Sequence, residues 1–189
     1  SAWQGFLQLL KKYRPRRPLN GVFVAVSVSD LMQQTEEELR QHAAAVRRRI
    51  MELNDRLGVQ LPVYVLFTKT DLIAGFNDFF ANLTEDERSQ VWGETFLRTE
   101  SANDNSAEHL QQFGRGYDEL VERLVQRRLK RMQEERDVQR RAAIFDFPQQ
   151  MMLFKAVATD FLRATFSTNR YEEPFLLRGV YFTSGTQQG

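Results

Sequence analysis

The chain has 189 residues, of which 42% are apolar, and carries 26 Lys and Arg against 25 Asp and Glu, for a formal net charge of +1. This length and apolar content suit one domain with a real core, and the absence of cysteine excludes thiol catalysis, disulfides and cysteine-based zinc sites. The balanced charge argues against a nucleic-acid-binding protein, and no apolar run approaches the roughly 20 residues that span a bilayer. The two histidines, His42 and His109, are far apart, so no metal site is expected.

Apolar residues at helical spacing predict a helix over residues 1–13, which Pro15 and Pro18 follow. A basic cluster occupies residues 11–17, and two interpretations of it are open. Its cations either complement the negative end of a helix dipole or attract an anionic surface such as lipid head groups. Because the chain begins without an initiator methionine, we expect it to be a fragment of a longer protein.

A strand, a helix and a second strand follow in the order of a βαβ unit. The Val-rich run at 21–29 predicts a strand that is apolar on both faces, as in a buried parallel sheet. Thr35 and Glu38 form a capping box that opens an amphipathic helix, and Gly58 is placed to end it. A second apolar strand is predicted at 63–67. Ligands bind at the carboxyl ends of such strands, so the residues that follow it matter most for function.

Those residues are Thr68, Lys69, Thr70 and Asp71, and their pattern resembles the guanine-recognition element NKxD of GTPases. A carboxylate at position 71 can accept from the ring N–H and the exocyclic amine of guanine, a pair that adenine does not offer. The methylene stem of Lys69 would lie over the base, whereas Thr68 stands where Asn is usual. The alternative interpretation is that Asp71 merely caps the following helix and that Lys69 is solvated.

Phosphate chemistry has no counterpart in this chain. No GxxxxGK[ST] motif occurs, and the only Gly-x-Gly pair, Gly114 and Gly116, lies in a helical context. We therefore expect no catalytic residue, no bound cofactor and no hydrolytic activity from these 189 residues alone.

The middle of the chain is predicted to be mainly helical. An aromatic cluster at 74–80 suits core packing, although a groove for a partner is also open. A capping box at 84–87 predicts a short helix that presents Trp92 and Phe96, and a polar loop is expected at 99–106.

A long helix is expected at roughly 107–142, with a polar end at Gln133–Arg141. That end either projects toward a partner or is a solvated surface with internal Glu–Arg pairs. The segment Ile144–Phe147 with Pro148 predicts a break, after which a broadly apolar helix should run over about 148–166.

The last predicted strand, 176–182, runs into Thr183, Ser184 and Gly185. In GTPase-like folds a Ser-containing loop at this position supplies a backbone amide to the base. We therefore expect this loop to lie beside the loop of residues 68–71.

Four stretches of the sequence together resemble the IcmF family, the TssM-like inner-membrane subunits of bacterial type VI secretion systems. They are GVFVAVSVSDL, LPVYVLFTKTDLIAGFNDFFANL, QVWGETF and LLRGVYFTSGTQQG, and the resemblance covers essentially the whole chain in order. It implies a cytoplasmic NTPase-like domain of a protein that is anchored in the bacterial inner membrane. Residues 1–189 would be the C-terminal portion of that domain, a partial P-loop (GTPase-like) fold without its phosphate-loop half, with helical additions at about 76–170.

The resemblance also implies partners and a binding site. The partners would be a DotU/TssL-like membrane protein, a TssK-like baseplate subunit and a TssJ-like lipoprotein that meets the periplasmic region, together with self-association. Thr68, Lys69 and Asp71 would be the base-recognition loop, and Thr183, Ser184 and Gly185 its neighbour. GTP or ATP with Mg would bind only to the full-length domain, because no residue here matches a phosphate or metal position.

The sequence thus predicts an α/β fold whose mostly parallel sheet has at least three strands with helices around it. Two functions are open: a structural and assembly role in secretion, or a nucleotide-binding switch, either GTPase or ATPase, that regulates assembly. Because the upstream strands would be missing, we also expect one edge or face of the sheet to be unusually exposed or covered by other chain material.

Overall fold

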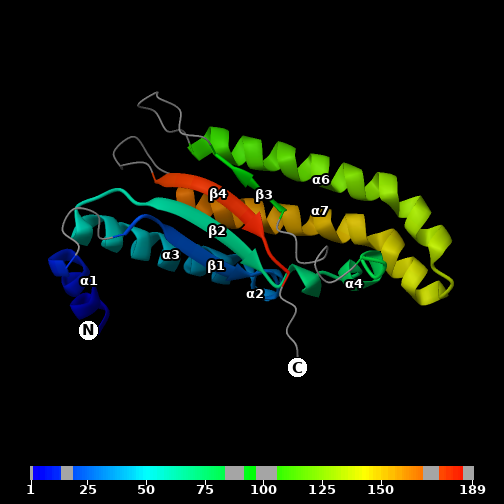
Figure 1. Cartoon of the computed structure of the whole chain (residues 1–189), viewed down its shortest axis with the longest axis horizontal. Coiled ribbons are helices and arrows are strands. Elements are labelled where there is room, and N and C mark those ends of the chain that lie inside the picture. The colour runs from blue at the N-terminus through cyan, green and yellow to red at the C-terminus, as the bar shows by residue number, and fades with distance from the viewer. Residues whose placement is uncertain (1, 14–18, 84–91, 97–105, 168–174, 185–189) are drawn as a thin grey trace.

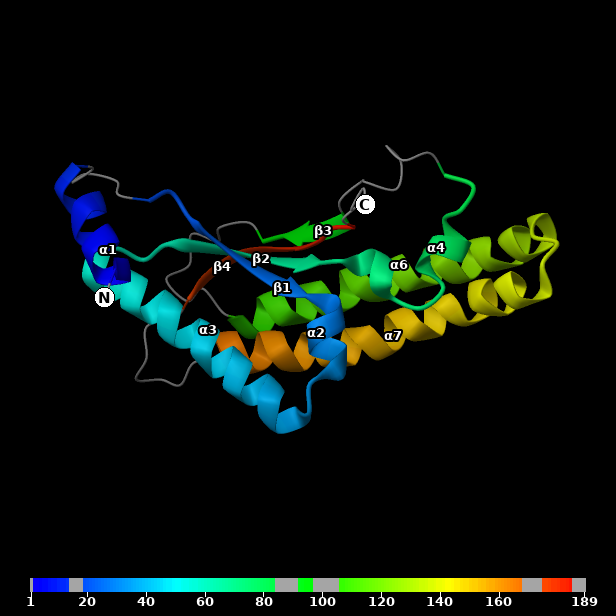
Figure 2. The same ribbon diagram turned by 90° about the horizontal axis from the view of Figure 1, so that it is seen from below.

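The computed structural model describes residues 2–13, 19–83, 92–96, 106–167 and 175–184 (Figure 1). In chain order its elements are α1 (Ala2–Tyr13), β1 (Val22–Ser27), α2 (Val28–Gln33), α3 (Glu36–Leu57), β2 (Pro62–Thr68), the 3-10 turn η1 (Thr70–Leu72), α4 (Phe76–Phe79), β3 (Trp92–Thr95), α6 (Ser106–Glu134), α7 (Val138–Phe166) and β4 (Leu176–Phe182). The helices α3, α6 and α7 lie on the same side of the sheet (Figure 2).

The sheet is mixed and four-stranded, in the order β1-β2-β4-β3. Strands β1, β2 and β4 are parallel, as predicted, and β3 pairs antiparallel with β4. The predicted helix through Trp92 and Phe96 is wrong for the residues that are described, because Trp92–Thr95 form β3. Gly93 suits this pairing, since a Cβ there would lie 2.6 Å from the carbonyl oxygen of Val180. The capping box at 84–87 lies outside the described residues.

The βαβ unit forms as its sequence signals indicate. The Thr35 hydroxyl accepts from the Glu38 amide over 3.3 Å, and the Glu38 carboxylate accepts from the Thr35 amide over 2.7 Å. Gly58 ends α3 with a φ of 67°. The first strand is shorter than predicted, because the Ser27 side chain caps the unpredicted helix α2 at Val28.

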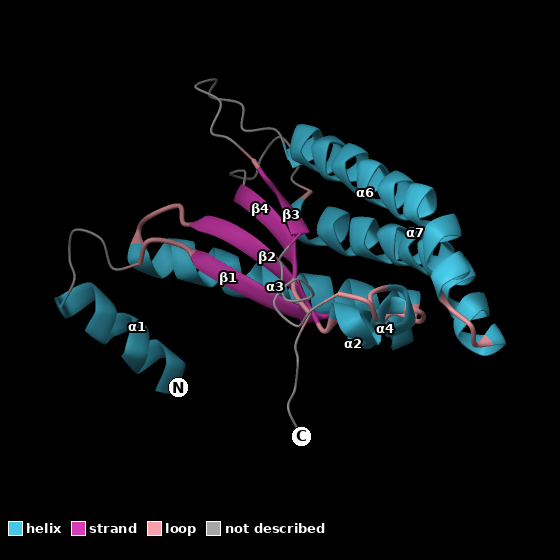
Figure 3. Cartoon of the chain, turned by 45° about the vertical axis from the view of Figure 1, so that its right-hand side comes forward, coloured by secondary structure: helices cyan, strands magenta, loops and turns pink. Residues whose placement is uncertain are grey.

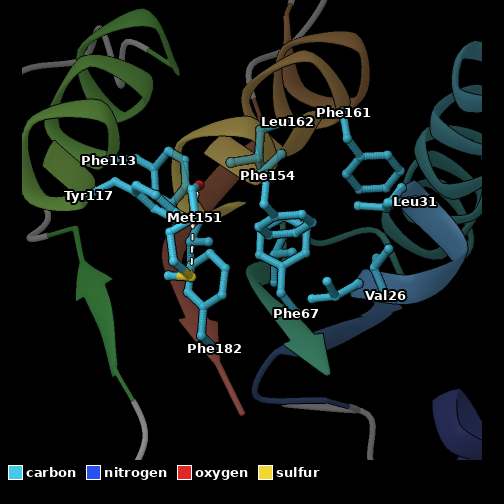
Figure 4. Packing of buried hydrophobic residues seen from close by; sticks show 14 of the residues in the cluster. Val26, Leu31, Phe67, Phe113, Tyr117, Met151, Phe154, Phe161, Leu162 and Phe182 are labelled. Carbon is cyan, nitrogen blue, oxygen red and sulfur yellow. Dashed lines mark hydrogen bonds between the residues drawn. The ribbon is translucent and has the colours of Figure 1, made fainter. Parts of the chain in front are cut away.

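The core lies between the sheet and α7 and is largely aromatic (Figure 4). The ring of Phe67 meets that of Phe154 edge to face at 5.5 Å, and Phe154 meets Phe182 in the same way at 5.8 Å. Tyr117 donates from its hydroxyl to the carbonyl of Met151 over 2.8 Å. Burial raises the pKa of Tyr117 far above its usual value, so this hydroxyl stays a hydrogen-bond donor.

Helices α6 and α7 form an antiparallel hairpin that extends beyond the sheet (Figure 3). The expected single helix over 107–142 is wrong, because α6 ends at Glu134. The side chain of Glu135 accepts from the Asp137 amide over 2.9 Å, and Asp137 then caps α7 by accepting from the Arg140 amide over 2.9 Å. The predicted break at Pro148 is also wrong, because this residue lies buried inside α7.

The outer face of the sheet carries aromatic side chains, of which Phe23 is exposed and Tyr64 and Tyr181 are half-buried. Phe23 is 67% exposed and stacks on Tyr64 at 5.3 Å between ring centres, and Tyr64 lies 6.5 Å from Tyr181. The expectation that the strands are buried on both faces is therefore wrong for β1, whose Phe23 and Ala25 are exposed. The expectation of an unusually exposed sheet edge or face agrees with β1 but stays a prediction for the rest of the sheet.

Candidate functional site

The two predicted base-side loops are joined directly by hydrogen bonds. The amide of Thr70 donates to the carbonyl of Thr183 over 3.1 Å, and the Thr70 hydroxyl donates to the same oxygen over 2.9 Å. The amide of Thr183 in turn donates to the carbonyl of Phe67 over 2.9 Å. These contacts follow from the parallel pairing of β2 with β4, which brings the carboxyl ends of both strands to one edge of the sheet.

Thr68 and Lys69 begin the first loop. The Thr68 side chain is half-buried at the end of β2 and reaches the carbonyl of Val26 over 3.5 Å. Lys69 is exposed, and among the described residues other than glycine it alone has a positive φ, at 60°. Such a backbone conformation is uncommon for a residue with a Cβ, and it recurs at ligand sites.

Asp71 does not act as a helix cap, which contradicts that part of the alternative interpretation. It lies inside η1, whose N-cap position is Lys69, and the next helix, α4, has Gly75 at its N-cap. The Asp71 side chain is half-buried, and its backbone carbonyl accepts from the side chain of Asn77 over 3.2 Å. The loop is thus held by backbone groups together with the Thr70 hydroxyl.

An apolar cavity of about 140 Å³ opens beneath the two loops, on the side of the helices. Thr70 and Ser184 supply the polar part of its lining, and the remaining lining side chains are apolar: Phe76, Phe80, Leu83, Trp92, Leu120, Leu124, Phe147, Met151 and Phe182. Lys69 and Asp71 do not line this cavity. The predicted site residues therefore come from two loops that are far apart in the chain and adjacent in space. Of these residues Ser184 lines the cavity, next to Thr70, and Gly185 lies outside the described residues.

The polar side chains of the two loops are hydroxyls, one carboxylate and one amino group. The described residues contain no cluster of three metal-binding side chains, and none of the described helices is long and apolar enough to cross a membrane. The hydroxyls of Thr70 and Ser184 can donate or accept hydrogen bonds, and the Asp71 carboxylate can accept them. Whether these groups and Lys69 recognise a ring stays a prediction.

Two arginines with structural roles were missed by the sequence analysis. The Nε of Arg131 donates to the carbonyl of Phe79 over 2.7 Å, and its Nη2 donates to the carbonyl of Asp78 over 2.9 Å, which ties the end of α4 to α6. Arg47 donates to the carbonyl of Thr165 over 3.0 Å near the end of α7. Buried arginines on predominantly polar helix faces leave no periodic signal in the sequence.

In the basic cluster near the start of the chain, one described side chain donates to a backbone carbonyl of another helix. Lys11 donates from its amino group to the carbonyl of Arg56 over 3.3 Å, in the last turn of α3. This contact is with the end of α3 and not with the end of the helix that carries the cluster, so both interpretations of the cluster stay open. Arg14, Arg16 and Arg17 lie outside the described residues.

The comparisons with known proteins agree with one another. The family model described as the IcmF-related N-terminal domain matches residues 1–189. The chain belongs to the IcmF family. It is 47% identical over 190 residues to the type VI secretion system component TssM1 of Pseudomonas aeruginosa, and the match covers all of this chain.

The match covers 17% of the length of that relative, so most of the relative lies outside the segment that corresponds to this chain. No solved structure matches the chain. The likeness of this IcmF-family domain to P-loop NTPases consequently stays a prediction.

Proposed function

We propose that this domain has a structural and assembly role on the cytoplasmic side of the inner membrane. In this role it docks partner subunits of the type VI secretion membrane complex. The partners that fit the family are a DotU/TssL-like membrane protein and a TssK-like baseplate subunit. The proposal makes no use of nucleotide hydrolysis.

The observation that carries the proposal is the open outer face of the sheet. Parallel sheets are normally covered on both faces, because their strands are apolar on both sides. Here Phe23, Tyr64 and Tyr181 form an aromatic row across three strands with no described helix over it (Figure 2). A domain that leaves such a face open is suited to being completed by other protein, which is what an assembly component requires.

A pull-down from cells that carry the secretion system tests this role. The full-length protein should capture both the TssL-like and the TssK-like subunit, and a form that lacks residues 1–189 should lose at least one of them. Retention of the TssJ-like lipoprotein by the shortened form serves as the control that the rest of the protein is folded. If the shortened form keeps both cytoplasmic partners, the proposal is wrong.

A second candidate function, a nucleotide-binding switch, is favoured by the hydrogen-bonded pair of loops and by the positive φ of Lys69. Isothermal titration of the complete cytoplasmic domain with GTP and with ATP tests it. Binding of GTP that Asp71→Ala abolishes would support guanine recognition. Tighter binding of ATP, or an affinity that Asp71→Ala leaves unchanged, would exclude guanine recognition.

A further inference from the structure

The α6–α7 hairpin exposes a stripe of apolar side chains. On α7, Val138, Phe145 and Met152 recur every seven residues, which is close to two helical turns, and they are 76%, 49% and 38% exposed. On α6, Val125 and Leu129 are one turn apart and are 41% and 70% exposed. We refer to these five residues as the hairpin patch.

Two contacts between the helices place both halves of the hairpin patch on one face. The guanidinium of Arg128 lies 4.6 Å from the ring centre of Phe145, and the amino group of Lys155 lies 2.6 Å from a carboxylate oxygen of Asp118. In an antiparallel hairpin these pairings set residues 125–129 opposite residues 145–148. The patch is therefore continuous across the two helices.

The hairpin patch points away from the core. Phe147 and Phe154, which meet α4 and the sheet, are at most 1% exposed and lie on the opposite side of α7 from Phe145 and Met152. Packing within this domain therefore does not require apolar residues on the outer side of the hairpin, where polar residues would serve solubility better.

The surroundings of the hairpin patch are basic. Residues 121–141 carry eight basic and four acidic side chains. The Nε of Arg128 is buried and has no hydrogen-bond partner among the residues that the structure describes. Arg141 is exposed one turn before Phe145. The acidic residues of this face include Glu122, one turn before Val125, and Asp118, which pairs with Lys155. A buried donor without an acceptor is costly, and the guanidinium of Arg128 is only half-buried, so a carboxylate that reaches it from outside would stabilise it.

We infer that the hairpin patch binds an amphipathic helix of a partner protein whose apolar stripe is flanked by carboxylates. The shallow surface between two antiparallel helices accepts a third helix, and the apolar side chains of that helix would cover the exposed side chains of the patch. Its carboxylates would pair with Arg128 and Arg141. The inference rests on the proposed assembly function, for which it names the docking surface and the chemistry of the partner.

Site-specific photo-cross-linking in the full-length protein, in cells with an assembled secretion system, tests the inference. A photoreactive residue at position 129 should cross-link to a segment of another secretion component that has helical apolar periodicity and flanking Asp or Glu. The same residue at position 51 on α3, where Met51 is 42% exposed, is the matched control and should give no such product.

Charge reversal then tests the recognition itself. The pair Arg128→Glu and Arg141→Glu should weaken capture of the cross-linked component about tenfold or more. Reversal of the partner's acidic residues to Arg should restore it. The pair Val138→Gln and Leu129→Gln, at strongly exposed positions that folding does not need, should weaken capture without changing the thermal stability of the protein.

Several results would overturn the inference: cross-links only to a second copy of this chain or to lipid, no cross-link at position 129, or capture that is indifferent to both pairs of changes. Failure of the proposed function can be distinguished from failure of this inference. If hairpin variants keep all partners but removal of residues 1–189 loses them, only the hairpin patch is excluded. If removal also keeps them, the assembly role itself is excluded.

Discussion

A change of Thr70 to valine tests whether a single hydroxyl locks the two base-side loops together. Thr70 is 5% exposed, and its hydroxyl donates to the Thr183 carbonyl over 2.9 Å. Valine keeps the shape of threonine and removes this bond. The Thr183 carbonyl still accepts from the Thr70 amide over 3.1 Å, so no buried acceptor is left unpaired. The expected loss is therefore that of one neutral hydrogen bond, about 0.5–1.5 kcal/mol in the free energy of unfolding.

Urea unfolding followed by tryptophan fluorescence measures this loss. Trp92 reports on the site, because its ring lies 5.2 Å from that of Phe182 at the end of β4. Trp3→Phe serves as the background, since it leaves Trp92 as the single fluorophore. A loss of 1 kcal/mol corresponds to a fall in melting temperature of about 2–4 °C for a domain of this size.

The matched control is Thr68→Val in the same loop, where the hydroxyl reaches the carbonyl of Val26 only at 3.5 Å. We expect a smaller loss there, because a bond of that length is weak. Unchanged stability of Thr70→Val, or an equal loss at both positions, would refute the claim that the Thr70 hydroxyl locks the loops. A loss above about 3 kcal/mol would also contradict it, because only an unpaired buried group costs that much.

Three further changes test the surrounding structure. Gly75→Ala should destabilise the domain by about 2–4 kcal/mol in urea unfolding, because Gly75 has a φ of 83° and a Cβ there would lie 2.5 Å from the carbonyl oxygen of Ala143; a loss below 1 kcal/mol would contradict this packing. Arg131→Met should cost about 2–4 kcal/mol, since it leaves two carbonyls of α4 unpaired, and faster proteolysis near α4 should accompany it. Backbone and side-chain hydrogen bonds from the N-cap lower the pKa of Glu38, so its stabilising effect is present at neutral pH and is lost as the pH falls through that lowered pKa. Glu38→Gln should accordingly reduce stability at pH 7 and leave it unchanged near pH 2, and an equal difference at both pH values would contradict the capping box.

The βαβ unit was predictable because local signals and packing agree there. The capping box of Thr35 and Glu38 and the left-handed Gly58 act within a few residues of the chain, so sequence alone specifies both ends of α3. The joining of the two loops was also predictable, since it follows from the parallel order of β2 and β4. Whether those loops bind a base stays a prediction.

The hairpin was mispredicted because tertiary packing outweighs a local preference. A proline inside a helix costs about 3 kcal/mol through one lost hydrogen bond and a ring clash. In α7, Pro148 is buried between Phe147 and Met151, and the burial of these side chains offsets that cost. The true break depends on Glu135 and Asp137, whose side chains bond to nearby amides, a turn signal that helical periodicity obscures.

Strand β3 was missed for a different reason. Four residues are too few to show alternation, and Trp92 and Phe96 have the spacing of one helical turn. Their strand geometry depends on pairing with β4, about 85 residues later in the chain, through contacts such as that of Gly93 with Tyr181. Such a non-local partner cannot be inferred from a window of sequence.

The two exposed apolar surfaces of the domain lie on opposite sides of it, which bears on its role. The aromatic row around Tyr64 is on the side of the sheet away from the helices, and the hairpin patch around Phe145 is on the side of the helices away from the sheet. The core lies between these two surfaces and buries neither of them. A domain that only completes a nucleotide site would need one such surface, which would contact the rest of that site. Two opposite surfaces instead suit a domain placed between two bodies, such as a partner subunit on the sheet side and a separate acidic helix on the hairpin side.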